Sequence, residues 1–133
     1  MKFFISAKST KREEAKILQE FFIKNGHQLS HDWTLHKNTR PFEEHTELAK
    51  EYADLDFKAI SESDFFIIIN EMSDTSPGAS AEFGMACALF KATGKPKIYV
   101  IAREELKNMF YLMPFVKRMK NVQEIADDLH NYS

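Results

Sequence analysis

Apolar residues follow two patterns that alternate along the chain. Short, almost continuously apolar runs are typical of strands buried on both faces of a parallel sheet. They predict strands at residues 3–5, 65–69 and 97–101, with a further short strand within 28–33. Helical spacing of apolar residues predicts helices from Thr10 to just before Gly26, and at about 42–61, 80–91 and 122–129. This alternation predicts a three-layer α/β domain, with about five parallel strands and helices on both faces of the sheet.

Several residues mark where the predicted helices begin and end. Thr10 and Glu13 have the spacing of a capping box, and Gly26 stands where a left-handed residue commonly ends a helix. Gly94 and Pro96 close the helix that precedes the last of the three apolar strands. Because ligands of such folds bind beyond the carboxyl ends of the strands, we expect the site where the strand order reverses.

Composition fits one globular domain, which we expect to span residues 1–133. The 44% hydrophobic and 29% charged residues exclude a disordered chain. The longest strongly apolar run, Phe65–Ile69, is far shorter than the roughly 20 residues that span a bilayer, so we expect no membrane association. Cys87 is the only cysteine, which favours a reducing, cytoplasmic location.

The charges of the chain are nearly balanced, with 18 Lys and Arg against 20 Asp and Glu. A protein that binds the nucleic-acid backbone carries a basic excess, so we expect no polymeric nucleic-acid partner. A small molecule is the expected partner.

Glu82 is the most informative carboxylate in the sequence. It is the only charged residue from Thr75 through Phe90, in a helical segment too apolar all round to face water. A glutamate in a first helical turn can be there for the helix dipole alone. A single carboxylate at the start of a buried helix, directly after the central strand, is also placed to act as a nucleophile or base.

Asp56 is a second carboxylate in an apolar setting. At 100° per residue it falls within a stripe of the long predicted helix formed by Leu48, Ala49, Tyr52, Leu55, Ala59 and Ile60. A buried aspartate can cap the backbone or pair with an arginine. If Asp56 instead converges with Glu82 on one pocket, the pair suits glycosidic cleavage, in which one carboxylate attacks and the other handles protons or holds a sugar hydroxyl.

Other side chains give weaker indications of chemistry. The histidines lack HExxH spacing and a cysteine partner, so we expect no metal centre and no cofactor. Trp33 and His36 follow the second strand and could stack on a planar base. A lone tryptophan is, however, more often a packing residue.

Four segments have an order and spacing that match a known protein family. They are Lys2–Ala7 at the first strand, Asp56 eight residues before Asp64, Pro77–Ala86 around Glu82, and Gly94-Lys95-Pro96. Together they resemble the nucleoside 2-deoxyribosyltransferase-like superfamily, which includes the transferases and the 2′-deoxynucleoside 5′-phosphate N-hydrolases. The resemblance covers most of the chain.

The resemblance implies a flavodoxin-like fold and roles for both carboxylates. Glu82 would be the nucleophile at C1′ of the sugar, and Asp56 would contact the ribose or base and assist proton transfer. The resemblance also implies a homodimer or larger homo-oligomer in which a neighbouring subunit helps to close each site. Asn108 lies where members send a polar residue into the neighbour's site.

Residue 76 helps to choose between branches of the superfamily. Six residues before the glutamate, the transferases typically carry an aspartate and the nucleotide hydrolases a serine near the 5′-phosphate; this chain has Ser76. The resemblance therefore favours a 5′-monophosphate substrate, with Lys8 and the backbone around Ser9 as further phosphate contacts at a helix N-terminus. The matching segments add three more residues to the expected substrate-binding set: Ser6, Ala7 and Gly78.

The chain departs from the family pattern at its first strand. Members usually offer a tyrosine there that positions the glutamate, but this chain has Phe3 and Phe4, and Ser6 stands at the following glycine position. A different group must therefore orient Glu82, or the reaction is slow.

The expected function is that of an N-glycosidase acting on the base–sugar bond of a nucleoside or (deoxy)nucleoside 5′-monophosphate. Exchange of nucleobases by a nucleoside 2-deoxyribosyltransferase is the first alternative. A nucleotide-binding or sensing module without turnover is the second, because the tyrosine is absent.

Overall fold

A five-stranded sheet with the order β2-β1-β3-β4-β5 lies at the centre of the computed structural model, which describes residues 1–70, 76–102, 105–106 and 108–131. Every pair of neighbouring strands is parallel. The strands are β1 (Lys2–Ser6), β2 (Gln28–Leu29), β3 (Phe65–Ile69), β4 (Lys97–Ile101) and β5 (Val116–Met119). The strand order reverses between β1 and β3, so a ligand is expected at the carboxyl ends of these two strands.

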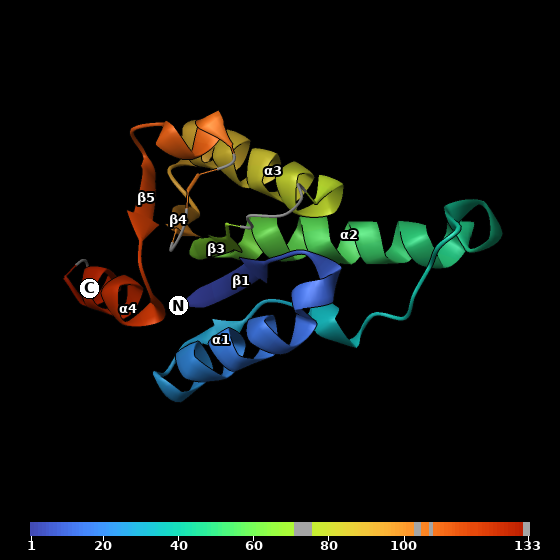
Figure 1. Cartoon of the computed structure of the whole chain (residues 1–133), viewed down its shortest axis with the longest axis horizontal. Coiled ribbons are helices and arrows are strands. Elements are labelled where there is room, and N and C mark those ends of the chain that lie inside the picture. The colour runs from blue at the N-terminus through green and yellow to red at the C-terminus, as the bar shows by residue number, and fades with distance from the viewer. Residues whose placement is uncertain (71–75, 103–104, 107, 132–133) are drawn as a thin grey trace.

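Helices cover both faces of the sheet (Figure 1). They are α1 (Arg12–Lys24), α2 (Thr46–Glu62), α3 (Pro77–Thr93) and α4 (Val122–His130). α2 packs against α3 on one face, and α1 lies with α4 on the other. The predicted three-layer α/β, flavodoxin-like architecture is confirmed.

Aromatic side chains fill the core between β1 and β3. The ring of Phe3 stacks on that of Phe65 with centroids 5.3 Å apart, and Phe4 stacks on Phe66 at 6.1 Å. All four side chains are fully buried. Such a pair contributes about 0.5–1.5 kcal/mol beyond the burial of its area. The two phenylalanines at which the chain departs from the family pattern therefore serve the core.

The start of α1 differs from the prediction, whereas its end agrees. Thr10 and Glu13 form no capping box, because Ser9–Lys11 form a 3₁₀ turn and α1 begins only at Arg12, with no hydrogen bond from the side chain that precedes it. Gly26 follows α1 with φ 89°, the left-handed conformation predicted for it.

The two helices that carry the candidate carboxylates also begin elsewhere than predicted. α2 begins at Thr46 rather than near Phe42, because residues 42–44 form a separate 3₁₀ turn and His45 leaves the helical region. α3 begins earlier than predicted, because Ser76 caps it by accepting a hydrogen bond from the Ala79 N–H at 3.3 Å. The proline that follows Ser76 suits a first helical turn, since it has no N–H to satisfy.

The two edge strands are short. β2 covers only Gln28–Leu29 of the predicted segment, and Trp33 lies beyond it in the 3₁₀ turn Trp33–Leu35. β5 could not be located from the sequence, because Val116 is its only buried residue and the strand lacks a continuous apolar run.

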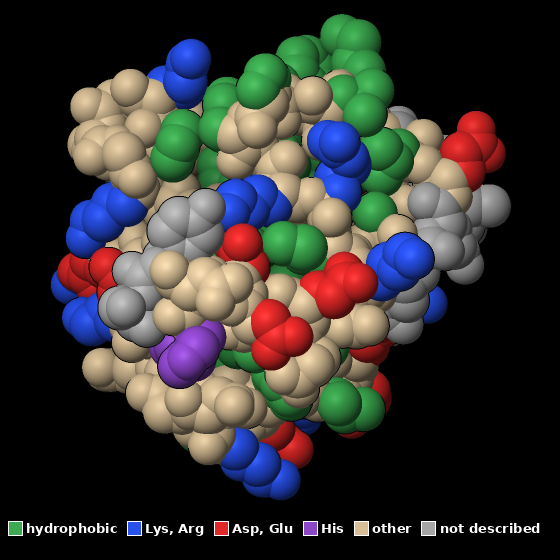
Figure 2. Space-filling view, turned by 90° about the vertical axis from the view of Figure 1, so that its left-hand side faces the viewer, with side chains coloured by type: hydrophobic (Ala, Val, Ile, Leu, Met, Phe, Trp, Pro, Cys, Tyr) green, Lys and Arg blue, Asp and Glu red, His purple; other side chains and the backbone are tan. Residues whose placement is uncertain are grey.

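The surface carries mixed charges. Acidic and basic side chains are interspersed on the side of the molecule that carries α4 (Figure 2). This arrangement agrees with the nearly balanced charge of the sequence. Among the helices of the described residues, none combines the length and apolar character needed to cross a bilayer.

Candidate active site

A cavity of about 860 Å³ lies at the carboxyl ends of β1 and β3. Its walls come from the segments that follow these strands, from α2 and from residues 33–40. The volume falls within the about 300–1,000 Å³ typical of small-molecule sites. Most of the predicted site residues line this cavity: Ala7, Ser9, Trp33, Asp56, Ser76, Gly78 and Glu82.

Glu82 is held by a serine of the neighbouring strand. The Ser6 hydroxyl donates a hydrogen bond to Glu82 Oε1 at 2.7 Å. Ser6 ends β1 and is fully buried, so it supports Glu82 and does not itself line the cavity as a substrate contact. Because α3 begins at Pro77, Glu82 lies in the second helical turn, beyond the first turn where the helix dipole acts on a carboxylate.

Asp56 reaches the cavity from α2 with one oxygen unsatisfied. Asp56 Oδ1 is buried and has no hydrogen-bond partner within the described part of the chain. Burial raises the pKa of Asp56 to about 6, although a hydrogen bond with Glu82 acts in the opposite direction. Among the described residues no arginine forms an ion pair with Asp56, so the arginine-paired aspartate that the sequence left open is not observed there.

The apolar stripe predicted around Asp56 is only partly buried. Ala59 and Ile60 lie in the core, whereas the Leu55 side chain is 37% exposed. The beginning of α2 extends past the end of the sheet (Figure 1), so its apolar residues have less of the protein to pack against. The predicted stripe drew attention to Asp56, but the apolar residues around Asp56 are less buried in the structure than the stripe implied.

Asp56 and Glu82 form one titrating pair. Burial raises the pKa of Glu82 to about 8; the Ser6 hydrogen bond lowers this pKa, and the charge and hydrogen bond of Asp56 raise it. No Lys or Arg of the described residues forms an ion pair with either carboxyl group. Two carboxyl groups so close cannot both ionise at low cost, so the pair holds one proton near neutral pH.

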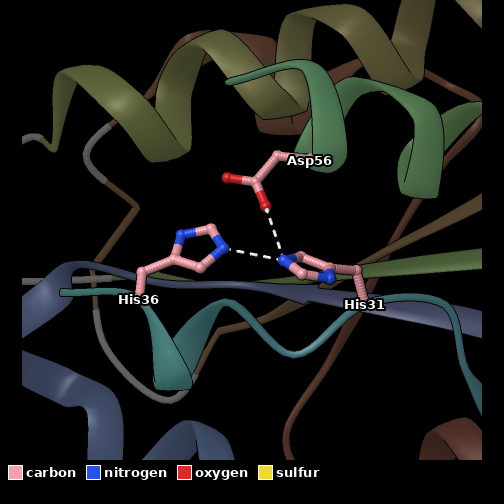
Figure 3. A group of neighbouring side chains, drawn as sticks. All are labelled: His31, His36 and Asp56. Carbon is pink, nitrogen blue, oxygen red and sulfur yellow. Dashed lines mark hydrogen bonds and ion pairs between the residues drawn. The ribbon is translucent and has the colours of Figure 1, made fainter. Parts of the chain in front are cut away.

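Two histidines lie beside Asp56 (Figure 3). His31 Nε2 is 2.7 Å from His36 Nε2 and 3.9 Å from Asp56 Oδ1. The His36 ring stacks on the Tyr52 ring, with centroids 3.7 Å apart and planes 2° from parallel. Burial, and then the charge of His31, lowers the pKa of His36 to about 4. The spacing of these histidines matches no ligand motif, so the sequence did not reveal the cluster.

The turn that carries His36 is fixed by local contacts. The Asp32 carboxylate accepts a hydrogen bond from the Thr34 N–H at 3.0 Å and caps the 3₁₀ turn. The Trp33 indole donates a hydrogen bond to the carbonyl of Ile5 and so ties the turn to β1. These contacts bring the chain back over the end of β1, which no pattern in the sequence predicts.

Three basic residues also line the cavity, and the sequence did not single them out: Arg12, Lys37 and Arg40. Arg12 Nη2 donates a hydrogen bond to the His36 carbonyl at 3.4 Å. The Arg40 guanidinium lies 5.7 Å from the centre of the Phe42 ring. Positive charge on this wall could hold an anionic part of a ligand.

Two residues predicted for the site lie away from the cavity. Lys8 precedes the 3₁₀ turn Ser9–Lys11 and does not line the cavity. Asn108 accepts a hydrogen bond from the Phe110 N–H at 2.9 Å and caps a 3₁₀ helix. Its predicted role concerns the site of a neighbouring subunit, so its absence from the cavity of its own chain leaves that prediction open.

The fold has a counterpart among solved structures. The structure of the CMP N-glycosidase BcmB from Clostridium botulinum matches it with a TM-score of 0.61 and 22% sequence identity, over 99% of this chain and 100% of that chain. No family model and no curated protein matches the sequence. At this identity the match establishes the fold. The resemblance to the nucleoside 2-deoxyribosyltransferase-like superfamily is therefore borne out at the level of the fold.

Proposed function

We propose that this protein is an N-glycosidase that cleaves the base–sugar bond of a nucleoside or (deoxy)nucleoside 5′-monophosphate. The observation that carries the proposal is the pair Asp56 and Glu82, both half-buried at the wall of a cavity of small-molecule size. Glycosidic cleavage uses two carboxyl groups, one as the nucleophile and one as the acid and base. The fold shared with a CMP N-glycosidase supports the same reaction class.

Glu82 is the nucleophile of the proposed reaction. Its carboxylate attacks C1′, the C1′–N bond breaks with its electron pair moving to the base, and protonated Asp56 gives the base a proton. Water then attacks C1′ of the glycosyl ester, Asp56 takes a proton from the water, and Glu82 leaves as a carboxylate. The sugar keeps its configuration, and the pair regains its single proton.

The location of that proton depends on the substrate. Glu82 has the higher pKa of the two, which favours the proton on Glu82, whereas the reaction needs it on Asp56. Positive charge that develops at C1′ favours an ionised Glu82. The leaving base in turn accepts the proton from Asp56. Substrate binding therefore shifts one shared proton within the pair, and no second proton has to be supplied.

Ser6 takes the place of the tyrosine that the superfamily resemblance assigns to the first strand. Its hydroxyl donates to Glu82 Oε1 and so orients the carboxyl group. The missing tyrosine was the main reason to consider a binding module without turnover. A buried hydroxyl that orients Glu82 weakens that alternative.

The phosphate of the substrate is assigned to the start of α3. Ser76 is the cap residue there, and unpaired N–H groups in a first helical turn favour an anion. Ser9 and Arg12 line the same cavity and add a backbone segment and a positive charge. Lys8 is left out of this proposed contact set because it does not line the cavity.

The remaining walls suit the sugar and base. Ala7 and Gly78 are small and let the substrate approach the backbone near the carboxyl pair. Trp33, His36 and Tyr52 give the cavity an aromatic wall on which a planar base could stack.

Release of free base tests the proposal directly. The protein is incubated with a panel of ribo- and deoxyribonucleoside 5′-monophosphates and the matching nucleosides, and free base is measured by chromatography. Release that favours the 5′-monophosphates and is absent in Glu82→Gln supports the proposal. No release from any substrate, or full activity in Glu82→Gln, contradicts it. Adding a second base separates the transferase alternative, which predicts base exchange without net hydrolysis.

Self-association is the proposed means of closing the cavity. Phe42 and Phe57 line the cavity, yet their side chains are 53% and 50% exposed, and Leu55 is also exposed. A second copy covering these residues would exclude water from the site. Sedimentation equilibrium should show a dimer or larger species that Phe57→Glu dissociates. A monomer at micromolar concentration contradicts this part of the proposal.

A further inference from the structure

The side chains of His31, His36 and Asp56 meet beside the cavity, and one atom among them, Asp56 Oδ1, has no hydrogen-bond partner in the described residues. His31, His36 and Asp56 place one donor atom each within 4.8 Å of the other two. In the described residues this is the one group of three or more His, Cys, Asp and Glu side chains arranged like this. Figure 3 shows a ring nitrogen of His36 and Asp56 Oδ1 both facing the Nε2 atom of His31.

The donor separations are close to those of a tetrahedral ion site. Zn²⁺ with bonds of about 2.0–2.1 Å holds its ligands roughly 3.3 Å apart. His31 Nε2 and His36 Nε2 are 2.7 Å apart, and His31 Nε2 is 3.9 Å from Asp56 Oδ1. The first distance must widen and the second must shorten, each by roughly 0.6 Å. The third separation, between His36 and Asp56, is within 4.8 Å and must also shorten.

The carboxylate oxygen is unsatisfied before any ion binds. Asp56 Oδ1 is buried without a hydrogen-bond partner among the described residues, and such an atom is rare unless a ligand or water meets it. This oxygen faces the histidines, which is a second indication of a ligand. It does not depend on the contact between the two imidazole rings.

The surroundings hold the ligands in place and leave room for a fourth. His36 is fixed by its stack on Tyr52, whose hydroxyl accepts a hydrogen bond from the Lys37 N–H at 3.0 Å. Arg12 near His36 opposes a cation, and the carboxylate of Asp32, which also lies near His36, offsets that charge. The adjoining cavity supplies space for a water molecule as the fourth ligand.

We propose that His31, His36 and Asp56 form a binding site for Zn²⁺, and that the ion inhibits the protein by capturing Asp56. Two imidazoles and one carboxylate with an open position are a common donor set for this ion. Binding of the ion stands on the geometry alone. Inhibition rests on the proposed function, because a carboxylate that coordinates Zn²⁺ cannot also give a proton to the leaving base.

Direct binding tests the site without any activity measurement. Calorimetric titration of chelator-treated protein with Zn²⁺ should show one ion per chain, and Co²⁺ should give the visible absorption of a tetrahedral complex. Loss of an outer partner of a metal ligand already costs about 10- to 100-fold in affinity. We therefore expect more than about 100-fold weaker binding in His31→Ala and His36→Ala, and also in His36→Gln, which retains bulk.

His45→Ala is the matched control, since His45 is exposed and does not line the cavity. It should bind Zn²⁺ as the unmodified chain does. The site is disproved if the unmodified chain binds no Zn²⁺ at micromolar concentration, or if the His31 and His36 variants bind as tightly as the control. Replacing Zn²⁺ by Mg²⁺ should give no binding, because imidazole is a poor ligand for Mg²⁺.

The inhibitory part is tested by base release with and without Zn²⁺. The ratio of the two rates is compared within each variant, so a variant's own loss of activity does not enter. Zn²⁺ should lower the rate at least ten-fold in the unmodified chain and in His45→Ala, with recovery on adding a chelator. An unchanged rate while calorimetry shows bound Zn²⁺ would disprove inhibition and leave the site standing. A chain that releases no base but binds Zn²⁺ would disprove the proposed function only.

Discussion

Asp128 and Asp56 are two aspartates of similar exposure in opposite electrostatic settings. Their side chains are 20% and 19% exposed, although more protein surrounds Asp56. Asp128 on α4 accepts a hydrogen bond from the Tyr99 hydroxyl at 2.7 Å and lies 2.9 Å from Lys117 Nζ. Burial alone would raise the pKa of Asp128, but the bonds from Tyr99 and Lys117 outweigh burial and lower it.

At the cavity, no Lys or Arg within the described part of the chain forms an ion pair with the two half-buried carboxyl groups. Asp56 has Glu82 and His31 as its neighbours, and burial raises the pKa values of Asp56 and Glu82 to about 6 and about 8. A carboxylate matched by a cation stabilises the fold, whereas an unmatched pair weakens it and is ready to move protons. Partners, more than exposure, therefore separate a structural carboxylate from a chemical one.

The largest effect should come from Glu82→Gln. The amide cannot form the glycosyl ester, so we expect base release to fall by at least about 10³-fold. Asp128→Asn is the matched control, because it alters an equally exposed carboxylate outside the cavity and should keep the activity. A similar loss of activity in both variants would show that the two carboxylates do not differ as described.

Asp56→Asn should have the next largest effect. Loss of an acid and base costs about 10²-fold or more in kcat/KM. The unmodified chain should give a bell-shaped pH profile, because the active pair carries one proton and its pKa values lie at about 6 and about 8. In Asp56→Asn no proton remains to be lost from the acid, so the falling limb at high pH should disappear. A bell of unchanged shape would assign the acid to another group.

Ser6→Ala should have a smaller effect of about ten-fold on kcat, because it removes one hydrogen bond to a charged group. That bond lowers the pKa of Glu82, which is the higher of the two pKa values of the pair, so its removal should move the falling limb of the profile to higher pH. Ser63→Ala is the control, since Ser63 is equally buried and its hydroxyl donates to the Ala59 carbonyl outside the site. A merely structural Ser6 would behave like Ser63 and leave the pH profile unchanged.

The fold could be predicted where the pattern of apolar residues determines the structure. The runs Phe65–Ile69 and Lys97–Ile101 are strands with the predicted bounds, because strands buried on both faces leave a continuous apolar run. Val116–Met119 escaped prediction, since an edge strand exposes one face and keeps few apolar residues. The starts of α2 and α3 depend on two single residues, His45 and Ser76. The spacing of apolar residues gives no information about either of them.

The candidate site could be predicted as far as it consists of polar residues in apolar surroundings. Glu82 and Asp56 stood out for that reason, and the structure places both at the cavity. His31 and Arg12 join them only through the fold of the turn after β2 and the start of α1. His36 was considered only for stacking on a base, and its position beside Asp56 depends on the same turn. Such loop geometry depends on long-range contacts and leaves no periodic signal in the sequence.

The smallest expected effect concerns thermal stability, where the two carboxylates should act with opposite sign. Because the pKa of Glu82 is raised in the folded chain, the folded state binds more protons than the unfolded state between about pH 4.5 and about pH 8. The free energy of unfolding of the unmodified chain therefore falls as pH rises through this range. Glu82→Gln removes that loss, so its Tm should exceed that of the unmodified chain most clearly near pH 8.

Asp128→Asn should shift Tm in the other direction. The lowered pKa of Asp128 means that its stabilising effect is present above the ordinary value of 3.8 and disappears as pH falls through the folded pKa. At pH 7 we expect a loss of about 1 kcal/mol in the free energy of unfolding, or roughly 4 °C in Tm. Calorimetry of both variants at pH 5 and pH 8 measures the two shifts. If both variants lowered Tm at pH 8, the carboxyl pair of Asp56 and Glu82 would be stabilising the fold. The pKa of Glu82 would then not be raised in the folded chain, and the proposed proton transfer would lose its support.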